Sequence, residues 1–75
     1  MFITMEMQTM ADGSFGVNKW TFDTIPEAEA KYYTLLSIAA LSSVYIHTAM
    51  IIDPFGTCLT SKSYTHEQPT EEQNV

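Results

Sequence analysis

The sequence has no arginine and three lysines in 75 residues, whereas nine residues are acidic, which gives a formal net charge of −6. Affinity for nucleic acids and for anionic lipid surfaces comes largely from basic side chains, so this composition argues against direct binding to either. Cysteine is equally scarce. Cys58 stands alone, so the chain can form no intramolecular disulfide, which is typical of a protein of the reducing cytoplasm.

Cysteine and histidine do not cluster along the chain, and we therefore expect neither a metal site nor a bound cofactor. A chain of this length forms one domain at most and buries a modest share of its surface. Small domains compensate for this with disulfides, metals or oligomerisation. Because the first two are not expected here, the composition favours self-association.

Charge is missing altogether from residues 32–52, a run of 21 residues that is long enough to cross a bilayer as one helix. Its two halves differ, however. The apolar residues of the first half follow the spacing of a helix that starts near residue 25, whereas residues 44–52 are rich in the β-branched and aromatic side chains that favour a strand. A spanning helix would also place Ser42, Ser43 and His47 in lipid without a basic flank. We therefore expect a helix followed by a strand, and no membrane span.

The first ten residues alternate between apolar and polar side chains, and Asp12-Gly13 follows them, a strong signal for a two-residue hairpin loop. With this loop, Met10 is expected opposite Phe15, and Glu6 opposite Lys19 as an ion pair on the outer face. The same register collects the apolar residues of both strands on the inner face: Ile3, Met5, Met7, Trp20 and Phe22.

The expected helix begins after Thr24, whose hydroxyl can cap the first turn together with Glu27 three residues later. Pro26 is tolerated in that first turn, where its missing N–H costs nothing.

A second hairpin is expected around residues 53–56, which read Asp-Pro-Phe-Gly, the signature of a type I turn, with a last strand at residues 57–64. A glycine bulge after such a turn would shift the pairing by one residue. Either Ile51 or Ile52 is therefore expected opposite Cys58.

These elements predict an α+β fold of ββαββ order, in which one helix packs on one face of a four-stranded antiparallel sheet. The strand order stays open. We expect a single domain at residues 1–64. Residues 65–75 are nearly all polar and hold three of the nine acidic residues, so a disordered acidic tail is expected there.

His47 and Cys58 both fall in the second expected hairpin, where they suggest a nucleophile with its base or half of a metal site. The sequence places no third orienting residue and no further ligand beside them. A sheet histidine and a small buried thiol that packs as a hydrophobe account better for both residues. We therefore expect no catalytic, cofactor-binding or metal-binding residue, and no enzymatic activity.

In the expected sheet, Val44, Ile46, Met50 and Ile52 face the helix, and the alternate residues line the opposite face. That opposite face would carry a continuous apolar patch, and large patches on small domains usually mark contact surfaces. Scattered surface aromatics are the alternative explanation. The expected interaction surface consists of Tyr45, His47, Ile51 and Tyr64.

Residues 27–37 read EAEAKYYTLLS and residues 47–56 read HTAMIIDPFG. Together they resemble a pattern in small uncharacterised open reading frames of Firmicutes and their phages, in which a hairpin, a helix with an E-A-x-x-x-[YF]-[HY] motif and a hairpin with D-x-x-G follow in order. The resemblance covers about residues 3–64. It implies a phage- or mobile-element-linked protein in the cytoplasm of a bacterial host, and it carries over no catalytic residue.

We therefore expect a small, non-enzymatic regulatory or interaction module that contacts another protein or a second copy of itself. The alternative is an acidic anti-defence inhibitor that mimics nucleic acid and blocks a host nucleic-acid-binding protein, which the net charge of −6 suggests. Deleting the tail would discriminate between them, because a mimic loses potency with its charge.

Overall fold

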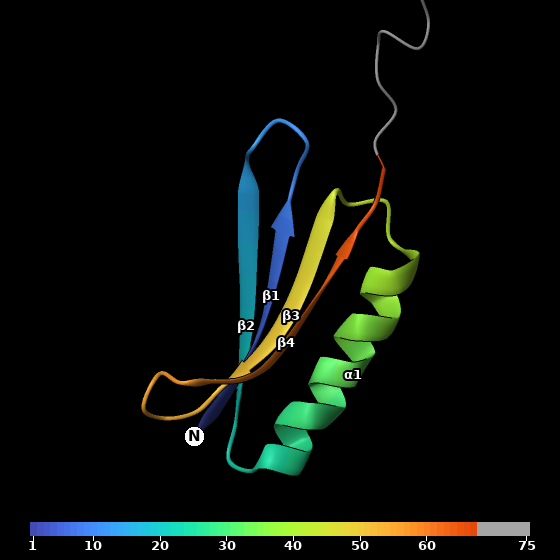
Figure 1. Ribbon diagram of the computed structural model, residues 1–75. Helices are drawn as coiled ribbons and strands as arrows, with labels where there is room; N and C mark the ends of the chain where they lie inside the picture. The colour runs from blue at the N-terminus through green and yellow to red at the C-terminus, as the bar shows by residue number, and fades with distance from the viewer. Residues whose placement is uncertain (68–75) are drawn as a thin grey trace, which may run out of the picture.

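The computed structural model describes residues 1–67 and contains four strands and one helix (Figure 1). The elements are β1 (Phe2–Thr9), β2 (Phe15–Phe22), α1 (Ile25–Leu41), β3 (Ile46–Ile52) and β4 (Cys58–Thr65). All neighbouring strands are antiparallel, and their order in the sheet is β2-β1-β3-β4. The predicted α+β fold of ββαββ order is confirmed, and the strand order that the sequence left open is resolved.

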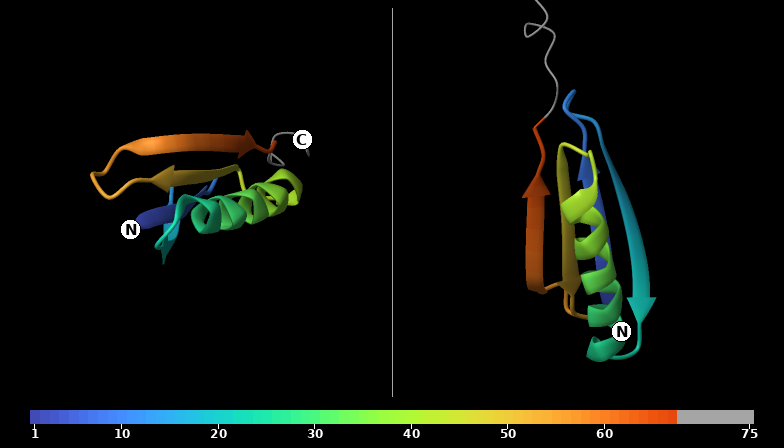
Figure 2. Two further views of the ribbon diagram at one scale, coloured as in Figure 1. Left: turned by 90° about the horizontal axis from the view of Figure 1, so that it is seen from below. Right: turned by 90° about the vertical axis from the view of Figure 1, so that its right-hand side faces the viewer.

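The helix covers one face of the sheet and lies mainly over β1 and β3, the two central strands (Figure 2). Within residues 1–67, no element covers the opposite face. We call that opposite side of the sheet the open face. None of the described helices combines the length and the apolarity that a membrane crossing requires.

Thr24 is the N-cap of α1, as the sequence predicts. Its Oγ1 accepts the backbone N–H of Glu27 at 3.4 Å, and its hydroxyl donates to the Glu27 carboxylate at 2.8 Å. Pro26 lies in the first turn. The helix ends at Leu41, and Ser42 is its C-cap.

The core between α1 and the sheet is small. It contains one side of the helix, with Ala28, Tyr32 and Leu35, and the Ala49 and Ile51 side chains of β3. Further apolar side chains pack around this centre, namely Phe2, Trp20, Phe22 and Leu36. The spacing of the buried helix residues agrees with the helical periodicity of the sequence.

The first hairpin has a longer loop than predicted. The N–H of Gly13 donates to the carbonyl of Met10 at 3.0 Å, and the N–H of Met10 donates to the carbonyl of Ser14 at 2.7 Å. Gly13 has a φ of 93°, whereas Asp12 keeps a negative φ. This is a type I turn followed by a left-handed glycine, a three-residue loop in place of the expected two-residue one.

The extra loop residue changes the register by one. Thr9 lies opposite Phe15, and Glu6 lies opposite Asn18, so the predicted Met10–Phe15 and Glu6–Lys19 pairs are wrong. Because side chains alternate along a strand, a one-residue slip moves every side chain of β1 to the other face.

In β1 it is therefore the polar side chains that point toward the helix. Thr4 and Glu6 are buried, and the Thr4 hydroxyl donates to the carbonyl of Ala28 at 2.8 Å. Ile3, Met5 and Met7, expected on the inner face, lie instead on the open face. Trp20 and Phe22 pack beside the core, as predicted.

The second hairpin repeats the turn of the first. The N–H of Gly56 donates to the carbonyl of Asp53 at 3.0 Å, the N–H of Asp53 donates to the carbonyl of Thr57 at 2.9 Å, and Gly56 has a φ of 86°. Ile52 lies opposite Cys58, which answers the open question of register, and a bulge separates this pair from the pair of Ile51 with Thr60.

The last strand extends to Thr65, one residue beyond the expected domain boundary. The N–H of His66 then donates to the carbonyl of Tyr45 at 2.7 Å. Most of the expected tail, residues 68–75, lies outside the described residues.

Candidate functional site

The predicted interaction surface lies on the opposite side of the sheet from where the sequence placed it. His47 and Ile51 are 1% and 2% exposed and lie under the helix. Tyr64 lies opposite His47 and is half-buried on the same side, and Tyr45 is half-buried just before β3. The expected facing of β3 was wrong, because α1 packs on Ala49 and Ile51.

His47 and Cys58 are not brought together. His47 pairs with Tyr64 near the end of β4, whereas Cys58 begins β4 and pairs with Ile52. The Cys58 thiol is exposed and donates to the carbonyl of Thr60 at 3.4 Å. The hypothesis of a nucleophile beside its base therefore has no support for this pair.

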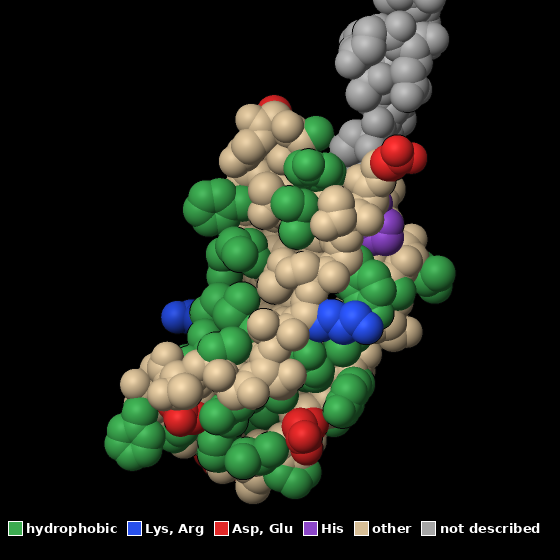
Figure 3. All heavy atoms as spheres, in the orientation of Figure 1, with side chains coloured by type: hydrophobic (Ala, Val, Ile, Leu, Met, Phe, Trp, Pro, Cys, Tyr) green, Lys and Arg blue, Asp and Glu red, His purple; other side chains and the backbone are tan. Residues whose placement is uncertain are grey.

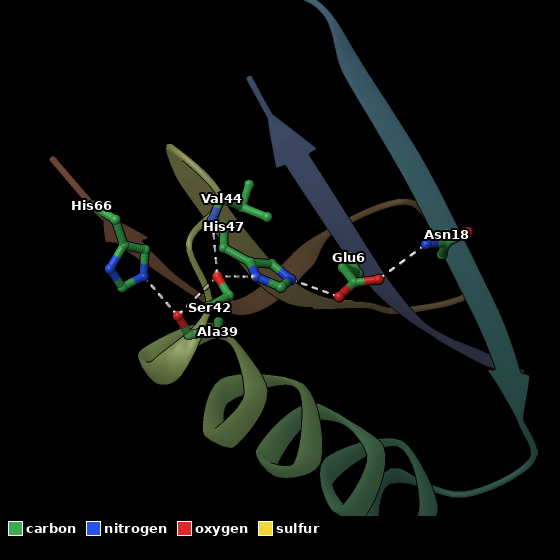
Figure 4. Close-up of polar contacts among 7 residues, drawn as sticks. All are labelled: Glu6, Asn18, Ala39, Ser42, Val44, His47 and His66. Carbon is green, nitrogen blue, oxygen red and sulfur yellow. Dashed lines mark hydrogen bonds and ion pairs between the residues drawn. The ribbon is translucent and has the colours of Figure 1, made fainter. Parts of the chain in front are cut away.

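A different polar cluster forms around His47 (Figure 4). His47 Nε2 lies 2.6 Å from Oε2 of Glu6, and this hydrogen bond joins the two central strands β1 and β3. On the other side of the ring, His47 Nδ1 lies 3.0 Å from Oγ of Ser42, the C-cap of α1. The three side chains form a continuous chain of hydrogen bonds from the sheet to the end of the helix.

Neighbouring residues extend this chain at both ends. Asn18 Nδ2 donates to Oε1 of Glu6 at 3.0 Å, which adds the edge strand β2. At the helix end, Ser42 Oγ lies 3.4 Å from the carbonyl of Ala39, and His66 Nε2 donates to the same carbonyl at 2.8 Å. The cluster therefore connects all five elements through side chains or their immediate flanks.

The hydrogen bonds keep Glu6 ionised despite its burial. Burial alone would raise the pKa of the Glu6 carboxyl, but hydrogen bonds from Asn18, His47 and Gln8 together outweigh it and leave the pKa below its ordinary value. The fold thus holds a carboxylate inside, against the imidazole of His47.

A hydroxyl, an imidazole and a carboxylate in this order are the components of a hydrolytic triad. Such a triad also needs room for a substrate beside the hydroxyl. Here Glu6 and His47 are 6% and 1% exposed, and no pocket exists among the described residues. The geometry shows that these hydrogen bonds fasten the end of α1 to the sheet.

The described part of the chain contains no candidate metal site. Residues 1–67 contain no group of three or more histidine, cysteine, aspartate or glutamate side chains close enough to hold an ion. Every buried side-chain nitrogen or oxygen atom of these residues has a hydrogen-bond partner. The cluster around His47 is therefore complete without a ligand.

The sequence interpretation missed Glu6, Asn18 and Ser42 as members of one cluster. The two-residue loop predicted from the sequence places Glu6 on the outer face, and the sequence predicts Ser42 only as part of a turn. A usable signal existed: Glu6 and His47 are the two titratable residues of β1 and β3, and the pairing of Glu6 with Ala49 and of Gln8 with His47 makes them diagonal neighbours on one face.

The open face presents the other candidate site. Its two central strands contribute half-buried apolar side chains, Ile3, Met5, Met7, Ile46, Met50 and Ile52. On the edge strand β2, Phe15 and Val17 face the same way and are 67% and 47% exposed. These eight residues form the apolar part of the open face.

Polar residues border this apolar part. Along β4 the open face carries Ser61, Ser63 and Thr65, and the Ser63 hydroxyl lies 2.8 Å from that of Thr48. Lys19 lies on β2, opposite Met5. Among the described residues, the acidic side chains lie elsewhere: Glu6 under the helix, and Asp12, Asp23, Glu27, Glu29, Asp53 and Glu67 in turns, in α1 or after β4.

No protein-family model, curated protein or solved structure matches this chain. The resemblance to small Firmicutes and phage open reading frames stays a prediction.

Proposed function

We propose that this protein is a small, non-enzymatic module that works by protein–protein contact, and that the contact surface is the open face of its sheet. The cytoplasmic setting in a bacterial host and the link to a phage or mobile element belong to the same proposal. The proposed contact residues are those of the apolar part of the open face. They differ from the residues that the sequence predicts for this role, which are Tyr45, His47, Ile51 and Tyr64.

The observation that carries the proposal is the reversed sorting of side chains along β1. An antiparallel sheet with one solvated face normally shows apolar residues toward the core and polar residues toward water. In β1 the polar Thr4 and Glu6 lie under the helix, and the apolar Ile3, Met5 and Met7 point away from it. A side-chain pattern of this kind is expected where a second layer covers the outer side.

The composition of the open face agrees with that of known contact surfaces. Interfaces have an apolar centre with few charges and a polar rim, and methionine is enriched in them. Figure 3 shows hydrophobic side chains gathered along the left-hand side of the molecule, where the sheet points away from the helix. Met5, Met7 and Met50 occupy the central strands, and the hydroxyl row of β4 forms one border.

The cluster of Glu6, His47 and Ser42 has a supporting role in this proposal. It lies on the covered side of the sheet and fixes the helix against β1 and β3. By holding α1 on one face, it leaves the other face free for a partner.

The proposal is tested in cells that carry the gene. Two differently tagged copies of the chain are expressed together, and the proteins that crosslink to one copy are identified, the other copy included. We expect Met5→Glu to abolish the crosslinks and Ile38→Glu to leave them intact, because Ile38 is exposed on the helix, which covers the other side of the sheet. Crosslinks that Met5→Glu leaves unchanged would contradict the proposal.

The net charge of −6 favours a second candidate, the acidic anti-defence inhibitor that mimics nucleic acid. Its contact surface would consist of the acidic side chains of the turns and of α1, rather than the open face. Such an inhibitor would bind a basic protein in a strongly salt-dependent way and would tolerate Met5→Glu. The crosslinking experiment therefore separates the two candidates.

A further inference from the structure

We infer that the occupant of the open face is a second copy of this chain, stacked face to face so that two four-stranded sheets form a sandwich with the helices outside. This inference rests on the proposed function, because it takes the open face as the contact surface and names its partner. Three observations carry it: charge, size and the arrangement of the polar border.

The charge of the open face favours a second copy of this chain over a different partner. The open face carries Lys19 and no acidic side chain among the described residues, although the whole chain has a net charge of −6. A strongly acidic or strongly basic partner would find little complementary charge there. The same chain offers the matching surface, one that is nearly neutral and apolar.

Size also favours a copy. A strand of eight residues is about 26 Å long, and four strands span about 19 Å, so the open face covers roughly 500 Å² in projection. Two stacked faces would cover roughly 1,000 Å², and side-chain relief raises the accessible area toward the range of about 1,200–2,000 Å² seen in specific complexes. Only a partner that covers the whole face reaches this range, and a second sheet of the same dimensions does so.

The polar border suits a two-fold axis that runs along the strands. Such an axis places β2 of one copy over β4 of its partner. Lys19 then meets the hydroxyl row of Ser61, Ser63 and Thr65, which can accept its hydrogen bonds, and the two lysines stay on opposite sides of the interface. Met5 and Met50, on the central strands, fall near the axis.

The test measures mass by sedimentation equilibrium of the full chain, with a reducing agent present so that Cys58 cannot crosslink two copies. The wild-type protein is expected at twice its mass of 8.4 kDa at a concentration of about 200 µM. Met5→Glu and Met5→Lys should each be monomeric, and a 1:1 mixture should dimerise again, since opposite charges then meet near the axis. Ile38→Glu is the control and should stay dimeric.

A second variant guards against misfolding. Val17 is 47% exposed in the single chain, so Val17→Glu should leave the circular dichroism spectrum unchanged while it raises the dissociation constant at least tenfold. A dimer that survives both Met5→Glu and Val17→Glu would overturn the inference, because the copies would then meet elsewhere, for example at a sheet edge.

A wild-type protein that stays monomeric would also overturn the inference, and binding of the dye anilinonaphthalene sulfonate then shows whether the proposed function falls with it. A monomer that binds the dye, and loses this binding with Met5→Glu, would leave the open face as a contact surface for a different protein. A monomer without such binding would overturn both.

Discussion

At the scale of single residues, the unusual feature is the placement of polar side chains beneath the helix. Glu6, His47 and Thr4 take positions that apolar residues occupy in most small domains. Burial of such groups is tolerated because each has a hydrogen-bond partner. The arrangement makes stability depend on particular partners and on pH, and this dependence can be measured.

Acid should destabilise the protein through Glu6. Since the pKa of Glu6 in the folded state lies below its ordinary value of 4.5, the unfolded chain takes up the proton first as the pH falls. The stabilisation by Glu6 is therefore complete above that value and is lost below it. We expect the difference in unfolding free energy between wild type and Glu6→Gln, from urea titrations, to shrink between pH 6 and pH 3.

The control for this experiment is Asp12→Asn. Hydrogen bonds from Ser14 hold the pKa of Asp12 below its ordinary value as well, but Asp12 lies on an exposed turn where solvent screens its charge. The difference in unfolding free energy between Asp12→Asn and wild type should therefore be smaller than that of Glu6→Gln at every pH. A Glu6→Gln difference that does not change with pH would contradict an ionised, partnered Glu6.

Thr4→Val should destabilise the protein by about 1 kcal/mol, because valine keeps the shape but leaves the buried carbonyl of Ala28 without its side-chain donor. Thr21 is exposed on β2, and Thr21→Val should change the free energy of unfolding far less. Denaturant titration of both variants measures this. Equal effects of the two substitutions would argue against the inward orientation of Thr4.

At the scale of elements, the two turns decide which side chains of the paired strands share a face of the sheet. Both hairpins use a type I turn followed by a left-handed glycine, at Gly13 and at Gly56. The three-residue loop of the first hairpin sets the register that puts Glu6 and Met5 on opposite faces of the sheet. The set of side chains on the open face therefore depends on the length of this turn as well as on the strands and the helix.

Gly13→Ala and Gly56→Ala should each cost about 1–2 kcal/mol of folding free energy, because a Cβ disfavours the left-handed conformation that both turns require. No atom lies within 4 Å of the added Cβ at either position, so the cost comes from the backbone and not from a clash. Gly16 has equal space and no positive φ, and Gly16→Ala should be neutral or slightly stabilising. Chemical denaturation of the three variants tests this, and a loss at Gly16 equal to the other two would contradict it.

At the scale of the whole molecule, charge and apolar surface are separated. Among the described residues, Glu6 lies under the helix and the other acidic residues lie in turns, in α1 or after β4, while the open face is nearly neutral. Two copies of net charge −6 repel each other at long range, whereas the stacked faces attract at short range. Because repulsion and attraction act on the same contact, self-association should depend on the salt concentration.

Raising the salt concentration from about 50 mM to about 500 mM should strengthen self-association, because the Debye length falls below about 10 Å and the repulsion is screened. Sedimentation at both concentrations gives the two dissociation constants. A chain that lacks residues 68–75, with two of the nine acidic residues removed, should show a smaller salt effect. Self-association that salt weakens more than tenfold would contradict an apolar contact between like-charged copies.

Residues close together in the sequence were sufficient to predict the helix, the strands and their order along the chain. The Thr24 cap, the helical spacing of Ala28, Tyr32 and Leu35, and the glycines of both turns each depend on neighbours a few residues away, and the structure confirms them. The uncharged run of residues 32–52 divides into a helix and a strand for the same reason.

The predictions of register and of facing required more than local chemistry. A loop of two or three residues at Asp12-Gly13 satisfies the same turn preferences, yet each choice sends the side chains of β1 to opposite faces. The predicted facing of β3 failed for a related reason. Ile51 and Ile52 are equally apolar, and only the position of the helix decides which of them is buried.

The sequence by itself determined the types of elements, their order and the net charge of −6, since these depend on composition and on residues close together in the chain. The tertiary structure alone decided that β1 lies beside β3, that Glu6 meets His47 beneath the helix and that Met5, Met7 and Met50 lie on the open face. The physical reason is that a strand has two faces of nearly equal propensity, and the choice between them is made by distant packing.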